Sequence, residues 1–244
     1  MSEECRSIMG AYLREALRKP GCPICRLIRD AEERLVKSIL YEYVNDPGVR
    51  REIRSSLGFC THHAWLLLRM ALSPEIADSL GAAIIYEDVV STYMESLEKG
   101  RIPEEENECP VCRTARETEE IYVEEFSKCY QVSEKFREEY ATLPAILCRR
   151  HLRMVLSRLP QKELRNQLLR AQLEKLKDIR ERLERLIEKH DYRSQEPITR
   201  REQQALREAI EALRGREVAT TLCDRAEPRR QRSSFLEKIL GRTR

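Results

Sequence analysis

The chain has 244 residues, of which 41% are hydrophobic and 36% are charged. With 4 Phe, 9 Tyr and 1 Trp, few large side chains can fill a core, and only 8 Gly interrupt a sequence rich in helix formers. The net charge is +3, but residues 161–244 hold 22 Lys/Arg and 15 Asp/Glu, whereas residues 1–160 hold 23 and 27. This composition indicates a soluble, charge-rich chain that is somewhat poor in apolar residues and favours helices over strands.

No stretch approaches the roughly 20 apolar residues that a membrane-spanning helix needs. The segment "MSEECRSIMG" also lacks the basic-then-apolar order of a secretory signal. We therefore expect a cytoplasmic protein that does not associate with membranes. In that reducing compartment, 9 cysteines indicate metal ligands or redox groups rather than a disulfide framework.

Apolar residues at steps of three and four predict a first helix from Pro23 to about residue 45. Asp46-Pro47-Gly48 ends it, and a shorter helix over 49–57 should end near Gly58. A further helix opens near Cys60, and another covers 75–99. The second half of the chain copies this order, with a long helix from Pro160 to beyond Leu186.

The two halves also share a pattern of rare residues. Cys-Pro-x-Cys occurs twice at an offset of 87 positions, and Cys-x2-His occurs twice at an offset of 88. The same superposition aligns Glu32 with Glu119 and Tyr43 with Tyr130. Because two copies of such a pattern are a poor coincidence, we interpret the chain as a duplicated helical unit.

The expected fold is all-α. The predicted domains are a first helical repeat with one metal site over 1–100, a second repeat with its own metal site over 101–190, and a C-terminal region over 191–244. That region should hold a helix opened by a capping box at Thr199 and Glu202, which ends by Gly215 and precedes a partly disordered basic tail. The tail contains a short amphipathic piece, with Phe235 and Leu236 followed by Ile239 and Leu240.

Two cysteines three positions apart can place both sulfurs on one ion, and Cys-x2-His can add a sulfur and an imidazole. If each repeat folds back on itself, the first site is Cys22, Cys25, Cys60 and His63. The second site is Cys109, Cys112, Cys148 and His151. Cys3His is a standard tetrahedral zinc set with no open position, so we predict two structural zinc ions per chain. An iron–sulfur cluster at the same ligands is the alternative.

The other candidates have plainer interpretations. His62 is expected at the surface or behind the ligands, although it could replace His63 if the helix starts later. Cys5, Cys129 and Cys223 have no partner at ligand spacing, so we expect buried small side chains or free thiols. His190 is expected to cap a helix end, and Trp65 is expected in the core.

The Cys-Pro-x-Cys-Arg segments, "GFCTHH", "ILCRRH" and "EKHDYRS" resemble an uncharacterised prokaryotic family catalogued as a domain of unknown function. The resemblance covers residues 20–215. Outside the cysteines, its most specific detail is the segment from Asp191 to Arg193. It implies a prokaryotic cytoplasmic protein and names no activity.

The sequence contains no phosphate-binding loop, nucleophile elbow or His-Glu-x-x-His motif. We therefore expect a zinc-binding helical protein that is not an enzyme and that interacts with another macromolecule, with an unknown protein as the partner. The alternatives are an iron–sulfur electron-transfer protein and a nucleic-acid-binding protein. Nucleic acid would contact the basic C-terminal region through Arg200, Arg201, Arg207, Arg214 and Arg229 to Arg232, although alternating charge signs there also suit a solvated surface.

Overall fold

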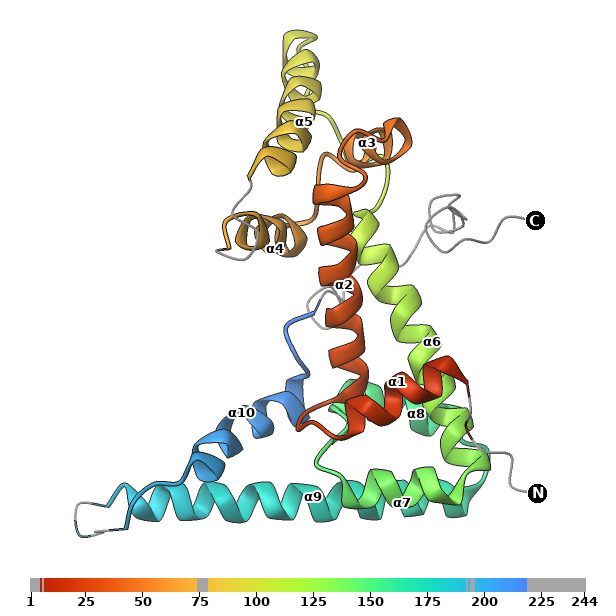
Figure 1. The fold of residues 1–244 in the computed structure, drawn as a ribbon, viewed down its shortest axis with the longest axis vertical. Coiled ribbons are helices and arrows are strands. Elements are labelled where there is room, and N and C mark those ends of the chain that lie inside the picture. The colour runs from red at the N-terminus through yellow and green to blue at the C-terminus, as the bar shows by residue number, and fades with distance from the viewer. Residues whose placement is uncertain (1–4, 6, 74–78, 192, 194–195, 219–244) are drawn as a thin grey trace. The chain divides into compact units, whose positions relative to one another are not determined.

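The computed structural model describes residues 5, 7–73, 79–191, 193 and 196–218 (Figure 1). Within these residues the chain is all-α, as predicted, with ten helices and no strand. In chain order they are α1 (Ile8–Leu17), α2 (Pro23–Tyr41), α3 (Pro47–Ser55), α4 (Thr61–Ala71), α5 (Leu80–Glu98), α6 (Pro110–Val132), α7 (Glu134–Thr142), α8 (Arg149–Arg158), α9 (Lys162–Lys189) and α10 (Arg200–Arg214). The predicted basic tail, with its amphipathic piece, Cys223 and Arg229 to Arg232, lies outside the described residues, as does Tyr192.

The described chain divides into two compact units. Unit A contains residues up to 28 and residues 118–218, and unit B contains residues 29–117. The continuous helices α2 and α6 each contribute residues to both units. The units therefore divide the chain differently from the two sequence repeats, because each takes parts of both.

The helix order α2–α5 is repeated by α6–α9, and equivalent positions start equivalent helices. Pro23 and Pro110 stand at the first position of α2 and α6, where a missing N–H is tolerated. Asp46 caps α3 by accepting a hydrogen bond from the backbone N–H of Val49 at 2.8 Å. Ser133, 87 positions later, caps α7 in the same way.

Four aromatic side chains form the centre of unit A. Phe126 and Tyr130 on α6 pack with Phe136 and Tyr140 on α7, and all four are at most 1% exposed. Phe126 contacts Phe136 and Tyr140 edge to face, with ring centroids 5.2 and 5.4 Å apart. Nearly all the large aromatic side chains of this unit's interior are thus concentrated where α6 meets α7.

A buried polar network holds the loop between α7 and α8. The Tyr140 hydroxyl donates to Gln172 Oε1 at 2.5 Å and accepts from the Leu147 backbone N–H at 3.2 Å. The Gln172 amide in turn donates to the Leu147 carbonyl at 2.7 Å. Because buried polar groups need partners, this network fixes the backbone immediately before Cys148.

The capping box predicted at the start of α10 is confirmed. Thr199 Oγ1 accepts from the Glu202 backbone N–H at 3.3 Å, and the Glu202 carboxylate accepts from the Thr199 N–H at 2.7 Å. The helix ends at Gly215, whose φ of 82° suits glycine. The predicted capping role of His190 is also confirmed, since it is the C-cap of α9 and its Nδ1 lies 2.7 Å from the Leu186 carbonyl.

In unit B, α3 ends through a left-handed turn. Leu57 and Gly58 have φ values of 49° and 93°, and the Gly58 N–H donates to the Ile53 carbonyl at 2.8 Å. The Ser56 hydroxyl donates to the Gly58 carbonyl at 2.7 Å, which orders the approach to Cys60. The prediction that Trp65 lies in the core is wrong, because its side chain is 58% exposed on the outer side of α4.

Gly81 is where α5 meets the end of α2. A Cβ atom at this position would lie 2.3 Å from the Leu40 carbonyl oxygen, a backbone atom that cannot rotate away. We expect Gly81→Ala to lower the free energy of unfolding by about 1–3 kcal/mol, despite alanine's better helix propensity. Urea unfolding followed by circular dichroism measures this. Ala83 is exposed and supplies the control, since Ala83→Ser should change the free energy of unfolding by less than about 0.5 kcal/mol. A Gly81→Ala variant as stable as the wild-type protein would contradict the close approach of α5 to Leu40.

Candidate metal centres

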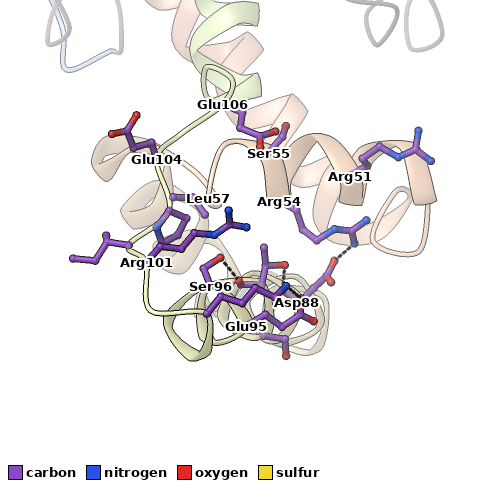
Figure 2. Close-up of a pocket in the computed structure, with 15 residues that line it drawn as sticks. Arg51, Arg54, Ser55, Leu57, Asp88, Glu95, Ser96, Arg101, Glu104 and Glu106 are labelled. Carbon is purple, nitrogen blue, oxygen red and sulfur yellow. Dashed lines mark hydrogen bonds and ion pairs between the residues drawn. The ribbon is translucent and has the colours of Figure 1, made fainter.

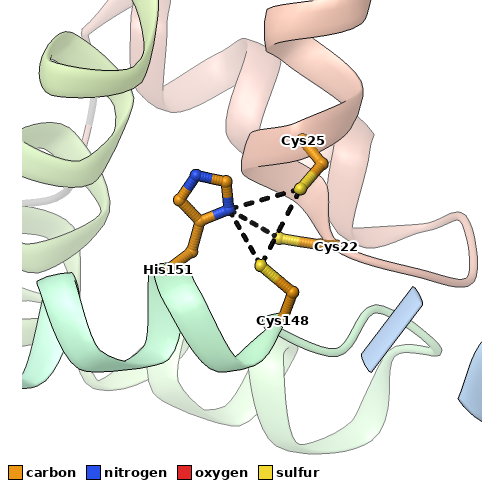
Figure 3. A group of neighbouring side chains, drawn as sticks. All are labelled: Cys22, Cys25, Cys148 and His151. Carbon is orange, nitrogen blue, oxygen red and sulfur yellow. Dashed lines mark hydrogen bonds between the residues drawn. The ribbon is translucent and has the colours of Figure 1, made fainter. Parts of the chain in front are cut away.

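The eight predicted ligands meet in two groups of four. Cluster A lies in unit A and consists of Cys22, Cys25, Cys148 and His151 (Figure 3). Cluster B lies in unit B and consists of Cys60, His63, Cys109 and Cys112. Each cluster offers three sulfurs and one imidazole nitrogen, the predicted Cys3His set.

The predicted pairing within each repeat is wrong. Each Cys-Pro-x-Cys pair meets the Cys-x2-His pair of the other repeat, so the two repeats exchange partners. Helix length gives the physical reason. The helix α2 has 19 residues, about 28 Å, but the next helix, α3, has only 9 residues, about 14 Å. α3 is therefore too short to carry the chain back along the whole of α2, and Cys60 lies with Cys109 and Cys112 instead of Cys22.

The ligand atoms of cluster A have the separations of a tetrahedral site. The three sulfurs lie 3.2–3.4 Å from His151 Nδ1, and the Cys25 and Cys148 sulfurs are 3.8 Å apart. A tetrahedral ion with bonds of about 2.3 Å to sulfur and about 2.0 Å to nitrogen places S and N about 3.5 Å apart and two sulfurs about 3.8 Å apart. Cluster A matches both values.

Cluster B has nearly the same geometry. Its three sulfurs lie 3.3–3.5 Å from His63 Nδ1, and the Cys112 and Cys60 sulfurs are 3.3 Å apart. The members of cluster A are all buried, whereas Cys60 in cluster B is half-buried. Both clusters can therefore enclose one ion, and that of cluster B is closer to solvent.

Helix starts bring the ligands together. Cys60 and Cys148 are the N-cap residues of α4 and α8, and Cys22 and Cys109 directly precede α2 and α6. In each motif the first cysteine accepts the first backbone hydrogen bond of the helix, which places the residue three positions later on the same side. The positive end of a helix dipole stabilises thiolate, the form that binds metal.

In each cluster the neighbouring side chains lower the pKa of one thiol and raise the pKa of the imidazole. Burial raises the pKa of the Cys22 thiol, but hydrogen bonds from Cys148 and Cys25 and the charge of His151 hold it well below its usual value. Burial lowers the pKa of His63, but Cys109, Cys60 and Glu32 outweigh burial and raise it to about 11. A divalent cation can supply the positive charge that each cluster favours.

A buried carboxylate lies behind the histidine of each cluster. In unit A, His151 Nε2 donates to Glu119 Oε1 at 2.8 Å, while Arg150 donates to both oxygens of Glu119 at 2.8 and 3.0 Å. Burial raises the pKa of Glu119, but His151 and Arg150 outweigh burial and lower it to about 2. In unit B, Glu32 Oε1 lies 3.4 Å from His63 Nε2. The sequence analysis did not predict that these two carboxylates contact the histidine ligands. The alignment of Glu32 with Glu119 was the signal that could have indicated it.

We expect Glu119→Gln to weaken metal binding at cluster A by about 10- to 100-fold, because the carboxylate fixes the ring orientation and basicity of His151. Competition with a chromophoric chelator measures the affinity of each cluster. Glu120→Gln is the matched control, since the Glu120 side chain is 67% exposed and pairs with Arg158 away from the cluster. Equal affinities in the two variants would contradict the assigned role.

Two other groups of sequence candidates are placed by the structure. Cys5 and Cys129 are buried, as one of the two predictions has it, but they form a disulfide with Cα atoms 5.1 Å apart, so the prediction of free thiols is wrong for both. Their separation of 124 positions hides this pairing from any argument based on local spacing. The His62 side chain is only 7% exposed and lies behind His63, which is the histidine that faces the sulfurs.

Unit B also has a polar groove of about 790 Å³ between α3, α5 and the segment after α5 (Figure 2). Four basic and four acidic side chains line it, and the Asp88 carboxylate accepts from Arg50 at 2.9 Å and from Arg54 at 2.6 Å. None of the eight cluster residues lines this groove. The balanced charges do not select one ligand.

The fold and clusters define a class of all-helical proteins with two buried Cys3His groups at tetrahedral spacing. The chain belongs to a family of unknown function, DUF6062, whose model matches residues 6–103 and 99–220. The chain is also 31% identical over 185 residues to the "Uncharacterized 23.9 kDa protein in xynA 3'region" of Caldicellulosiruptor sp. (strain Rt8B.4), which covers 74% of this chain and 87% of that relative. No solved structure matches the chain. The predicted resemblance to an uncharacterised family is thus confirmed.

Proposed function

We propose that the protein binds two structural zinc ions, one in each cluster, and acts through contacts with another macromolecule rather than by catalysis. The distances of 3.2–3.8 Å between ligand atoms in cluster A carry this proposal. None of them is longer than the distance between two ligands of one tetrahedral zinc ion. All four positions of each ion would be taken by side chains. A closed site of this kind has no open coordination position for a substrate.

The ligand chemistry supports zinc over the iron–sulfur alternative. An iron–sulfur cluster places several irons and sulfides between its protein ligands, so those ligands lie farther apart than around one ion. Three thiolates and one imidazole in a tetrahedron are typical of zinc. The iron–sulfur electron-transfer function therefore has no supporting geometry here.

A protein partner is supported by apolar side chains at the surface of unit B. On α4 and at its C-cap, Trp65, Leu68 and Leu72 are 58%, 40% and 65% exposed, and they recur at helical spacing. Exposed tryptophan is typical of protein interfaces.

The nucleic-acid alternative receives less support. Two of its candidate arginines in α10 already pair with acids, since Arg207 lies 3.0 Å from Glu211 and Arg201 lies 3.5 Å from Asp178. Ion pairs of this kind reduce the positive charge available to phosphates.

The proposed cytoplasmic location suits six cysteines that must stay reduced to bind metal. There the Cys5–Cys129 disulfide would be open to thiol–disulfide exchange. Among the described residues, none of the helices combines the length and the apolar character needed to cross a bilayer.

Elemental analysis of protein purified without chelator tests the proposal. We expect at least two zinc ions per chain and no visible absorption. Cobalt substitution should then give thiolate-to-cobalt charge-transfer bands of an intensity that corresponds to two tetrahedral sites. A brown protein with iron and sulfide, or a metal content below about one ion per chain, would overturn the proposal.

A further inference from the structure

A second group of metal-binding side chains lies behind cluster B. Glu32 on α2 and His62 and His63 on α4 place a carboxylate and two imidazole nitrogens within 4.8 Å of one another. The Glu32 and His63 side chains are 0% exposed and that of His62 is 7% exposed. These are three interior polar groups whose ligand atoms lie close together.

The distances within this group are too long for good hydrogen bonds. His63 Nε2 lies 3.4 Å from Glu32 Oε1, and His62 Nε2 lies 3.9 Å from Glu32 Oε2. An N–H···O hydrogen bond is typically about 2.7–3.2 Å long. Neither Nε2 atom has a hydrogen-bond partner, although both are buried. Buried polar atoms without a partner are costly, so a ligand that joins them is favoured.

Unit A has the corresponding arrangement, in which a side chain next to the histidine ligand contacts the buried carboxylate. Arg150 occupies the position that aligns with His62, and its guanidinium donates to both oxygens of Glu119. His151 lies 2.8 Å from the same carboxylate, compared with 3.4 Å for His63 and Glu32. The shorter His62 side chain stops 3.9 Å away. Unit B thus has an imidazole at the position where unit A has a guanidinium group.

We propose that Glu32, His62 and His63 Nε2 bind a further divalent cation of the zinc type beside cluster B. An ion with bonds of about 2.0–2.1 Å to nitrogen and oxygen separates its ligands by about 3.4 Å in a tetrahedron, and by more as the angles open. The 3.4 Å between His63 Nε2 and Glu32 Oε1 fits the tetrahedral value, and the 3.9 Å from His62 Nε2 is measured to the other carboxylate oxygen, Oε2. Two imidazoles and one carboxylate are the ligand set of open zinc sites, which leave the fourth position to water.

This proposal extends the proposed function because His63 belongs to both sites. Its Nδ1 faces the sulfurs of cluster B and its Nε2 faces Glu32. His63 would bridge two ions through its two ring nitrogens, and its Nε2 proton would be released to solvent on binding. Unit A, in which Arg150 satisfies Glu119, would bind the ion of cluster A alone. The whole chain would therefore bind three ions, of which two have thiolate ligands.

Equilibrium dialysis of the full chain against cobalt(II), with elemental analysis and absorption spectra, tests the proposal. We expect three cobalt ions per chain, with charge-transfer intensity that corresponds to two. His62→Arg, which copies the arrangement of unit A, should bind two ions with unchanged charge-transfer intensity. His62→Gln serves if the arginine variant does not fold, and it should also lose one ion. His190→Arg is the matched control, since His190 lies outside both clusters and its Nδ1 lies 2.7 Å from the Leu186 carbonyl, and it should keep three ions.

Two bound ions in both the wild-type chain and His62→Arg would overturn the third site and leave the proposed function intact. A third ion that persists in both His62 variants would also overturn it, because the ion would then lie elsewhere. An absence of charge-transfer bands would instead overturn the thiolate sites. Even then, a cobalt content that falls by one ion in the His62 variants would still support the third site. The two proposals can therefore be contradicted independently.

Discussion

Removal of metal by a strong chelator is expected to lower the thermal unfolding temperature of the protein steeply and to reduce its helix content. In cluster A the ligands join the start of α2 to the start of α8, at positions up to 129 residues apart in the chain. Without an ion, three buried thiols and an imidazole would have to satisfy one another in the interior. Structural zinc contributes an apparent free energy of about 10–16 kcal/mol per site in small zinc domains.

Circular dichroism during heating, with and without chelator, measures this effect. Zinc added back should restore the original curve, whereas magnesium should not, because it prefers oxygen ligands. An unchanged unfolding curve in protein shown by elemental analysis to be metal-free would contradict a structural role for the ions.

The exchanged pairing predicts opposite outcomes for two double variants. Cys22→Ser with Cys148→Ser removes two ligands from cluster A and none from cluster B, so one chelator-resistant thiolate-bound ion should remain. Cys22→Ser with Cys60→Ser removes one ligand from each cluster and should leave no chelator-resistant ion. Each Cys→Ser substitution removes a thiolate ligand, and a serine hydroxyl does not bind the metal ion with comparable affinity.

Metal content after exposure to a chelator of moderate strength separates the two outcomes. Cys5→Ser with Cys129→Ser is the control, since this pair lies outside both clusters and should keep both thiolate-bound ions. If Cys22→Ser with Cys60→Ser keeps one resistant ion and Cys22→Ser with Cys148→Ser keeps none, the sites are formed within the repeats and the exchange is contradicted.

Local signals in the sequence predicted most of the fold. Pro23 and Thr199 mark helix starts through short-range chemistry, and the structure begins helices beside both of them. Asp46 was predicted only to end the first helix, and it also caps the start of α3. Rare residue types in a repeated pattern identified the eight ligands of the two Cys3His groups, although not how they are divided between the groups. These features depend on neighbours a few positions away, which a sequence displays directly.

The partner of each ligand pair could not be predicted in the same way. In a duplicated chain, Cys22 and Cys25 can meet either Cys60 or Cys148, because both partners have the same local pattern. Which of the two meets Cys22 and Cys25 depends on how far the chain travels back after α2. The next helix, α3, is only 9 residues long. The Cys5–Cys129 disulfide and the burial of His62 depend likewise on contacts between distant segments.

X-ray absorption at the zinc edge tests the central claim most directly. If clusters A and B each hold one ion, the average zinc environment of the wild-type chain should include sulfur at about 2.3 Å together with nitrogen and oxygen at about 2.0 Å. In His62→Arg, where only the two thiolate sites should remain, the fit should give three sulfurs and one nitrogen per zinc. A first shell made of nitrogen and oxygen without sulfur would contradict the account.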